Sequence, residues 1–189
     1  MTMKIEIPHI PSIGTTLSYS KSARDFAVLK ELMAQGECRL DTPLMITLKV
    51  IPERDMIKVK GVITTSAMLM CSRCLEEYHR PIDHSFTLRF SRQIPADLHD
   101  SDEGQVELTA DQIGLIYFHG DEIDFKDSVQ EQMVLALPMK PLCSENCKGL
   151  CQRCGANLNV QPCTCGDDKS NSPFAVLIGR KWPTSSTEK

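Results

Sequence analysis

The sequence lacks any long apolar run, and this excludes the usual helical route across a membrane. No stretch approaches the roughly 20 consecutive apolar residues that a membrane-spanning helix needs. The first residues, 1–6, also lack the apolar core of a secretory signal peptide. We therefore expect a cytoplasmic protein whose thiols stay reduced. In that setting a cysteine-rich pattern indicates metal binding or catalysis rather than a disulfide framework.

Catalytic signatures are also missing from the sequence. It contains no P-loop, no nucleophile elbow and no glycine-rich dinucleotide fingerprint. The histidines are scattered, and none has the H-x-x-x-H or H-E-x-x-H spacing of a catalytic metal site: His9, His79, His84, His99 and His119. These absences predict a protein that is not an enzyme.

Cysteine, by contrast, is abundant and strongly patterned. Eight of the nine cysteines form four short pairs, which we number along the chain: Cys71 and Cys74, Cys143 and Cys147, Cys151 and Cys154, Cys163 and Cys165. Structural zinc sites bind four thiolates in a tetrahedron, and a short-range pair supplies one edge of it. Because the ligands are all sulfur, the pattern predicts two structural zinc sites rather than catalytic ones. Cys38 is left over and is interpreted as a small core residue.

Several divisions of the four pairs are open at this point. The third pair resembles a zinc-ribbon knuckle, because Gly155 permits the positive φ often needed after the second ligand. The fourth pair follows closely enough to complete a local site, which we favour. The first and second pairs would then form the other site and close a long loop. Alternatively, the second pair joins the third and the first joins the fourth, or a single site forms and the remaining cysteines are free.

Two further interpretations concern the surroundings of these cysteines. A site of four thiolates and one Zn²⁺ is formally dianionic, and basic residues that can offset this charge, or instead bind phosphate, stand nearby: Arg73, Lys140, Lys148 and Arg153. The C-x-x-C spacing also occurs in dithiol redox catalysts, but there it lies near a helix start in a βαβ unit. Cys71 instead follows a strand-like run, which disfavours the redox interpretation.

The net charge of −4 conceals an uneven distribution. Residues 97–127 contain ten acidic residues and one base, Lys126, so this segment has a formal charge of −9. The rest of the chain has a formal charge of +5. A nucleic-acid-binding surface is usually basic, so such a surface exists here only if the acidic segment lies elsewhere. The simpler interpretation of the acidic segment is a solvated loop.

Hydrophobic periodicity predicts an α+β fold. Alternating residues indicate strands over 3–8, 44–51, 57–70 and 85–90, so that the first cysteine pair lies at the turn between two strands. Helical spacing indicates helices near 22–35, with Ser22 as N-cap and Gly36 as its stop, and near 124–137. Strands followed by a helix, without βα alternation, predict an antiparallel β-sheet or small β-barrel with two main helices.

We expect three parts along the chain. Residues 1–140 form the β-rich domain, residues 141–168 a C-terminal zinc-knuckle module, and residues 169–183 a docking segment. The last part contains Ser172 and Pro173, which suit the N-cap and first position of a short helix. This helix either packs on the core or binds a partner.

Several segments together carry a resemblance to a known family. They are Cys71-Ser-Arg-Cys74-Leu-Glu-Glu, Glu131-Gln-Met-Val-Leu-Ala-Leu-Pro-Met-Lys-Pro-Leu-Cys143, Cys147-Lys-Gly-Leu-Cys-Gln-Arg-Cys-Gly-Ala-Asn-Leu-Asn159 and Pro173-Phe-Ala-Val-Leu177. In this order they resemble the YceD family, the large ribosomal RNA subunit accumulation proteins of bacteria and plastids. Gln152 departs from the pattern, since related knuckles often have proline there; this affects the rigidity of the knuckle more than metal ligation.

The resemblance implies a non-enzymatic ribosome biogenesis factor that supports 23S rRNA accumulation and large-subunit assembly. Its implied partners are pre-rRNA or large-subunit ribosomal proteins, with no membrane and no small-molecule substrate. Two alternatives are a protein-interaction module without RNA contact, which uses the acidic segment or the 172–178 helix, and a thiol redox or metal-buffer protein. The zinc prediction depends on the cysteine spacing alone, whereas the ribosome prediction depends on the resemblance.

Overall fold

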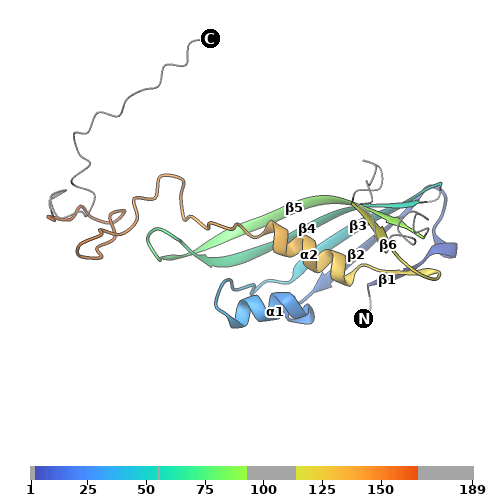
Figure 1. The fold of residues 1–189 in the computed structure, drawn as a ribbon, viewed down its shortest axis with the longest axis horizontal. Helices are drawn as coiled ribbons and strands as arrows, with labels where there is room; N and C mark the ends of the chain where they lie inside the picture. The colour runs from blue at the N-terminus through green and yellow to red at the C-terminus, as the bar shows by residue number, and fades with distance from the viewer. Residues whose placement is uncertain (1–2, 55, 93–113, 166–189) are drawn as a thin grey trace, which may run out of the picture.

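The fold is an open, mostly antiparallel sheet with two helices on one face (Figure 1). The computed structural model describes residues 3–54, 56–92 and 114–165. Its main sheet has five strands in the order β2-β3-β4-β5-β6: β2 (Thr15–Lys21), β3 (Leu44–Glu53), β4 (Met56–Met70), β5 (Glu77–Ser91) and β6 (Leu115–Tyr117). A second sheet pairs β1 (Lys4–Glu6) with β7 (Glu122–Asp124). The helices are α1 (Ala27–Ala34) and α2 (Lys126–Ala136), with 3₁₀ turns η1 (Ile7–His9) and η2 (Ala23–Asp25).

The α+β prediction is confirmed, whereas the β-barrel alternative is wrong. Strands β2 to β5 pair antiparallel, and β6 adds to β5 in the parallel direction. The order begins with β2 and ends with β6, which do not pair with each other, so the sheet does not close. The three-residue β6 leaves the far edge of the sheet short, which limits unwanted edge pairing.

Alternation along the strands sorts side chains between the two faces of the sheet. In β3, Leu44, Ile46 and Leu48 are buried, while the intervening Met45 and Thr47 are exposed. A period of two places successive side chains on opposite faces, so the buried set faces the helices. One face of the sheet therefore builds the core, and the other remains uncovered by any helix in the described part of the chain.

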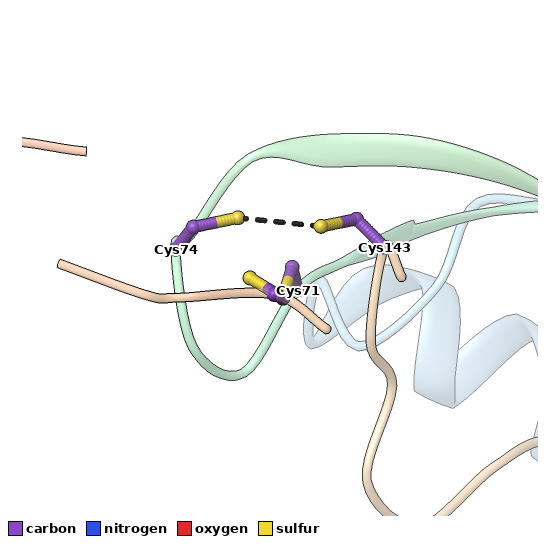
Figure 2. Close-up of side chains that lie close together, drawn as sticks. Cys71, Cys74 and Cys143 are labelled. Carbon is purple, nitrogen blue, oxygen red and sulfur yellow. Dashed lines mark hydrogen bonds between the residues drawn. The ribbon is translucent and has the colours of Figure 1, made fainter. Parts of the chain in front are cut away.

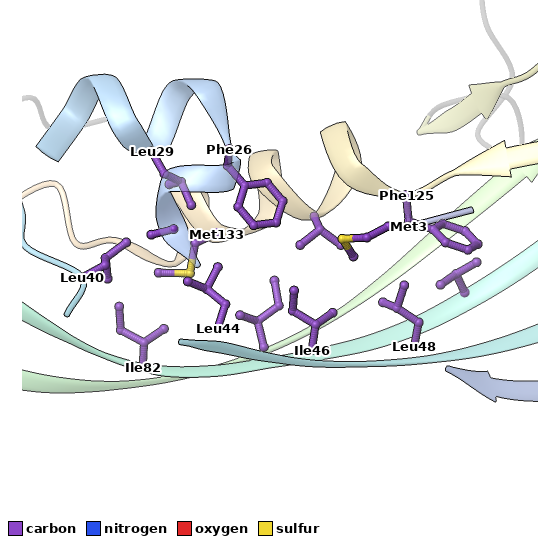
Figure 3. Packing of buried hydrophobic residues seen from close by; sticks show 14 of the residues in the cluster. Met3, Phe26, Leu29, Leu40, Leu44, Ile46, Leu48, Ile82, Phe125 and Met133 are labelled. Carbon is purple, nitrogen blue, oxygen red and sulfur yellow. The ribbon is translucent and has the colours of Figure 1, made fainter. Parts of the chain in front are cut away.

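Both helices pack against the buried face through a few large side chains (Figure 3). Phe26 and Leu29 come from the first helical region, and Phe125 and Met133 from the second; each is at most 1% exposed. Phe125 meets the ring of Phe90 on β5 edge to face, with 5.7 Å between the ring centroids. Aromatic pairs of this geometry add to the stability that burial alone provides. The sheet and α2 are thus held together near the start of the helix.

The predicted helix near 22–35 is interrupted at Phe26. Ser22 does form a capping box, in which its Oγ accepts from Arg24 N at 3.3 Å and its N–H donates to Asp25 Oδ2 at 3.2 Å. This box starts η2 rather than α1, because Phe26 takes an extended backbone, with φ −107° and ψ 122°. Gly36 ends α1 as predicted, with φ +77°. Insertion of Phe26 into the core accounts for the break.

The helix predicted near 124–137 is α2, and it leads directly to the second cysteine pair. Asp124 Oδ1 accepts from Lys126 N at 2.9 Å, which satisfies one of the free amides of the first turn. Along the helix, Gln132 Oε1 lies 3.2 Å from His84 Nε2 on β5, and Gln130 Oε1 accepts from Val28 N at 2.9 Å. These contacts fix α2 against both β5 and α1. The chain that leaves α2 runs toward the β4–β5 turn (Figure 1).

No helix in the described part of the chain has the length and apolar character to cross a membrane. The docking segment predicted at 169–183 and residues 93–113 of the acidic region lie outside the described residues. The division of the chain at residues 140 and 168 stays a prediction.

Candidate metal centres

The first centre brings together the first and second cysteine pairs. The Sγ atoms of Cys71, Cys74, Cys143 and Cys147 all lie within 4.8 Å of one another. Cys71 Sγ is 3.7 Å from Cys147 Sγ. Cys74 Sγ is 3.6 Å from Cys143 Sγ, the contact that Figure 2 marks with a dashed line. Four sulfurs bound tetrahedrally at about 2.3 Å from one ion are about 3.8 Å apart. The thiols of this centre therefore have the spacing that a tetrahedral metal ion requires.

The second centre combines the third and fourth pairs. The sulfurs of Cys151, Cys154, Cys163 and Cys165 also lie within 4.8 Å of one another. The structure thus groups the cysteines in the favoured division, one local group and one group that joins distant segments. Either group can hold a metal ion; that the ion is zinc stays a prediction. Cys38 lies in neither group and is buried in the core at 5% exposure.

The two C-x-x-C turns are built in the same way. In the first, Cys71 N donates to Glu76 O at 2.9 Å and Leu75 N donates to Cys71 O at 3.0 Å. In the second, Cys151 N donates to Ala156 O at 2.8 Å and Gly155 N donates to Cys151 O at 2.9 Å. The residue after the second cysteine has a positive φ in both turns, +60° at Leu75 and +71° at Gly155. The sequence signalled this conformation only where it has glycine.

We expect Leu75→Gly to stabilise the chain by about 0.5–1 kcal/mol. A left-handed conformation costs a non-glycine residue roughly 1–2 kcal/mol, and the greater freedom of glycine in the unfolded chain offsets part of that gain. Little packing is lost, since Leu75 is 58% exposed. Denaturant unfolding of the metal-loaded chain measures the change. The matched control is Gly155→Leu in the equivalent turn, which should lose about 1–2 kcal/mol. A loss of stability in Leu75→Gly contradicts the argument.

Hydrogen bonds join the first turn to the segment that follows α2. Ser72 donates to Pro141 O from both its N–H, at 2.9 Å, and its Oγ, at 3.0 Å. Arg73 Nη1 donates to the carbonyls of Cys147 at 2.9 Å and Glu145 at 3.3 Å. Arg73 was considered as a counter-charge or phosphate ligand; here its guanidinium holds the loop that carries the second cysteine pair. The turn therefore binds this segment with its backbone and side chains as well as with thiols.

The asparagines between the third and fourth pairs were missed at the sequence level. Asn159 Nδ2 donates to Cys147 Sγ at 3.3 Å and to Asn157 Oδ1 at 2.9 Å, while Asn159 Oδ1 accepts from Lys148 N at 2.7 Å. Asn157 Nδ2 in turn donates to Glu76 Oε1 at 3.4 Å. The loop of the second centre thus orients a sulfur of the first. Two asparagines two residues apart within a cysteine-rich segment were the available signal.

Backbone amides and neighbouring thiols set the acidity within each centre. Burial raises the pKa of Cys71, but hydrogen bonds from the backbone of Cys143, Cys74 and Arg73 lower it to about 6. Burial and the adjacent thiols raise the pKa of Cys143 to about 12. One thiol is therefore readily ionised while another retains its proton. A bound cation would stabilise all four thiolates at once, which is the chemistry that a metal supplies here.

The second centre repeats this asymmetry. Hydrogen bonds from the backbone of Cys154 and Arg153 lower the pKa of Cys151 to about 6. The hydrogen bond with the thiol of Cys154 and, to a smaller extent, burial raise the pKa of Cys165 to about 11. The adjacent hollow, about 410 Å³, is lined by Lys148, Cys163 and the intervening segment 158–162, with no histidine or carboxylate. The donor set of both centres fits structural zinc.

Comparison with known proteins identifies relatives over most of the described region. Residues 59–179 match the family described as large ribosomal RNA subunit accumulation protein YceD. The chain is 26% identical over 153 residues to the chloroplastic YCED homolog 1 of Arabidopsis thaliana, covering 72% of this chain and 48% of that protein. It is 29% identical over 143 residues to the chloroplastic YCED homolog 1 of Zea mays, covering 66% and 49%.

A bacterial relative is an uncharacterized protein of Mycobacterium leprae, 27% identical over 120 residues, covering 64% of this chain and 51% of that protein. The chain spans about half the length of these relatives. No solved structure matches it significantly.

Proposed function

Because the chain belongs to the YceD family of large ribosomal RNA subunit accumulation proteins, we propose that it supports 23S rRNA accumulation and assembly of the large ribosomal subunit. The observation that carries the proposal is the extent of the family match. Residues 59–179 include nearly all of the β4–β5 hairpin, α2 and all eight paired cysteines. The segments that build both candidate metal centres are therefore the segments shared with the family.

In this proposal the protein is a cytoplasmic, non-enzymatic factor with two structural zinc ions. Thiolates from four cysteines saturate a tetrahedral ion, which leaves no open position for a substrate. Zinc would hold the segment after α2 against the β4–β5 turn, and would fold the local loop that ends at Cys165. The partners would be pre-rRNA or large-subunit ribosomal proteins. The metal ions act by fixing the shape of the molecule.

Two alternatives remain distinct from this proposal. A protein-interaction module would bind a ribosomal protein without contacting RNA. A thiol redox or metal-buffer protein would need accessible thiols. In the first centre Cys71, Cys74 and Cys147 are buried at 4% exposure or less, whereas Cys143 and the cysteines of the second centre are half-buried or exposed. Both C-x-x-C turns also lie outside helices, whereas redox catalysts place this motif at a helix start. Burial in the first centre and the placement of both turns thus favour a structural role of the cysteines.

Deletion of the gene is expected to lower the ratio of 23S to 16S rRNA and to deplete large subunits. Quantification of both rRNAs and sucrose-gradient profiles measure the effect, and a plasmid copy should restore it. The protein itself should sediment with precursors of the large subunit. A normal rRNA ratio in the deletion strain, with the protein absent from all precursor fractions, would contradict the proposal. Complementation with a Cys38→Ala copy should also restore the rRNA ratio, because Cys38 lies outside both centres.

A further inference from the structure

The sheet has a face that no described helix covers, and this face carries a compact group of basic residues. The strand register places Lys49 of β3 directly opposite Lys60 of β4, and Lys58 of β4 directly opposite Arg89 of β5. Directly paired residues point to the same side of a sheet. Residues 46, 48, 57 and 59 alternate with these and are buried under the helices. The four basic side chains therefore project from the uncovered face, which we call the basic face.

The arrangement opposes the stability of the sheet. Cβ atoms of directly opposed residues lie about 4.5–5.5 Å apart, and like charges in such pairs are destabilising. Two adjacent like-charge pairs repeat this cost. Glu53, at the end of β3, offsets part of it, with its Oε1 3.1 Å from Lys58 Nζ. A surface that keeps two adjacent unfavourable pairs is better explained by a ligand that neutralises them than by folding.

Other titratable groups on this face lie toward its opposite end. Asp83 of β5 pairs with Thr64, four residues along β4 from Lys60, a distance of about 13 Å. His79 and Glu77 pair with Met68 and Met70, still farther along the strand. At physiological salt, charges more than about 8 Å apart are largely screened when exposed. These groups therefore do not neutralise the basic face.

The dimensions and chemistry of the basic face suit a polyanion. Three neighbouring strands and one two-residue step along them span about 10 Å by 7 Å, so the positive charges reinforce one another. Exposed hydroxyls continue the row of Lys49 and Lys60 on both sides, Thr16 on β2 and Thr87 on β5. Lysine, arginine and hydroxyl side chains are the usual donors to phosphate oxygens. The register of β6 places one aromatic side chain on this face among the described residues, the half-buried Tyr117 beside Ser91. A single half-buried ring does not form a platform on which successive bases could stack.

We propose that the basic face, formed by Lys49, Lys58, Lys60 and Arg89, binds the sugar-phosphate backbone of RNA. The choice of RNA over an acidic protein rests on the proposed ribosomal function. Because the described part of the face offers several donors to phosphate but only the half-buried Tyr117 to contact a base, binding is largely independent of base sequence and depends steeply on salt. The overall charge of −4 therefore conceals two features of opposite sign, the basic face of the sheet and the acidic sequence of residues 97–127.

The test is equilibrium binding of RNA to the full zinc-loaded chain, compared between two charge-matched double variants. K49Q/K60Q removes the central pair of the basic face, and K30Q/K126Q removes two exposed lysines from α1 and α2 on the opposite side. The probes are an oligouridine and an RNA duplex, each of about 20 nucleotides per strand, titrated over a range of salt. A poly-glutamate peptide of similar length reports binding of an acidic protein.

We expect K49Q/K60Q to bind RNA at least about tenfold more weakly at ~0.1 M salt, with the slope of log K against log salt reduced by about 1.4 for oligouridine. K30Q/K126Q should stay within about twofold of the parent chain. K49Q/K60Q should also unfold at an equal or higher temperature, because a repulsive pair is removed. A loss of RNA binding without a loss of stability excludes a general folding defect.

Either of two results overturns the inference: unchanged RNA binding by K49Q/K60Q, or binding of poly-glutamate but not RNA at this face. The second result would assign the face to an acidic protein. Rejection of RNA binding by the basic face can be distinguished from rejection of the proposed ribosomal function. A lowered ratio of 23S to 16S rRNA in the deletion strain, together with normal RNA binding by K49Q/K60Q, would reject the basic face alone. A normal 23S level in the deletion strain would reject the ribosomal role whatever the binding shows.

Discussion

Replacing Cys71 with serine is expected to remove one of two zinc ions per chain and to detach residues 141–150 from the β4–β5 turn. Structural zinc sites contribute about 10–16 kcal/mol in small zinc peptides. The hydrogen bonds that otherwise hold this segment, from Ser72 and Arg73, contribute about 1 kcal/mol each. The proposed zinc ion of the first centre would therefore decide whether the segment stays bound. Loss of one thiolate should release the segment while the sheet remains folded.

Metal analysis and hydrogen exchange measure this outcome together. The zinc content should fall from two ions to one, and the amides of residues 141–150 should lose protection while those of β3 and β4 keep it. Cys163→Ser is the matched comparison, because it belongs to the other centre. It should also release one zinc ion but leave residues 141–147 protected. Unchanged zinc content and unchanged protection in Cys71→Ser would exclude the link between turn and tail.

Grouping of the cysteines could be anticipated from spacing because the local constraint is strong. The third and fourth pairs are close in sequence, so a short loop is enough to bring them together. Placement of Cys71 at a turn between two strands followed from the alternation on either side, and the structure confirms that turn between β4 and β5. The role of Asn159, by contrast, could not be predicted from the spacing of the cysteines. Its donation to Cys147 Sγ depends on how the second centre sits beside the first, which spacing does not encode.

Strands β2, β6 and β7 escaped the sequence analysis for a physical reason, whereas β1 lies within the strand predicted over 3–8. β2 alternates half-buried Leu17 and Tyr19 with exposed Thr16 and Ser18, a weaker contrast than in the central β3. Edge strands bury less of each side chain, so selection for apolar residues at alternate positions is weaker. β6 and β7 have three residues each, too few to show a period. The parallel pairing of β6 with β5 therefore appears only in the structure.

The basic face also could not be predicted from the sequence alone. Lys58 and Lys60 are visible in the sequence as the polar members of one alternating strand. Their meeting with Lys49 and Arg89 depends on the register of three strands. A one-residue shift in register would move a strand's side chains to the other face. Charge patterning along the chain therefore indicates a basic remainder, and only the sheet registers turn it into a surface.

Phe125→Ala is expected to destabilise the chain by about 3–5 kcal/mol, the usual loss when a buried phenylalanine is truncated. Its ring is 1% exposed and packs edge to face on Phe90, where the start of α2 meets β5. The matched control is Leu135→Ala on the same helix, because Leu135 is 71% exposed and should change stability by less than about 0.5 kcal/mol. Urea unfolding followed by circular dichroism measures both variants.

The zinc content of Phe125→Ala separates the core from the metal centres. Phe125 belongs to the large core cluster, whereas Cys71, Cys74 and Cys147 form a separate buried cluster. Below the unfolding transition, two zinc ions should therefore remain bound although the sheet domain has lost several kcal/mol. A loss smaller than about 1 kcal/mol would show that α2 is not anchored at Phe125. Loss of zinc from the folded variant would instead show that the position of α2 controls the first centre, since the chain passes from α2 directly to Cys143.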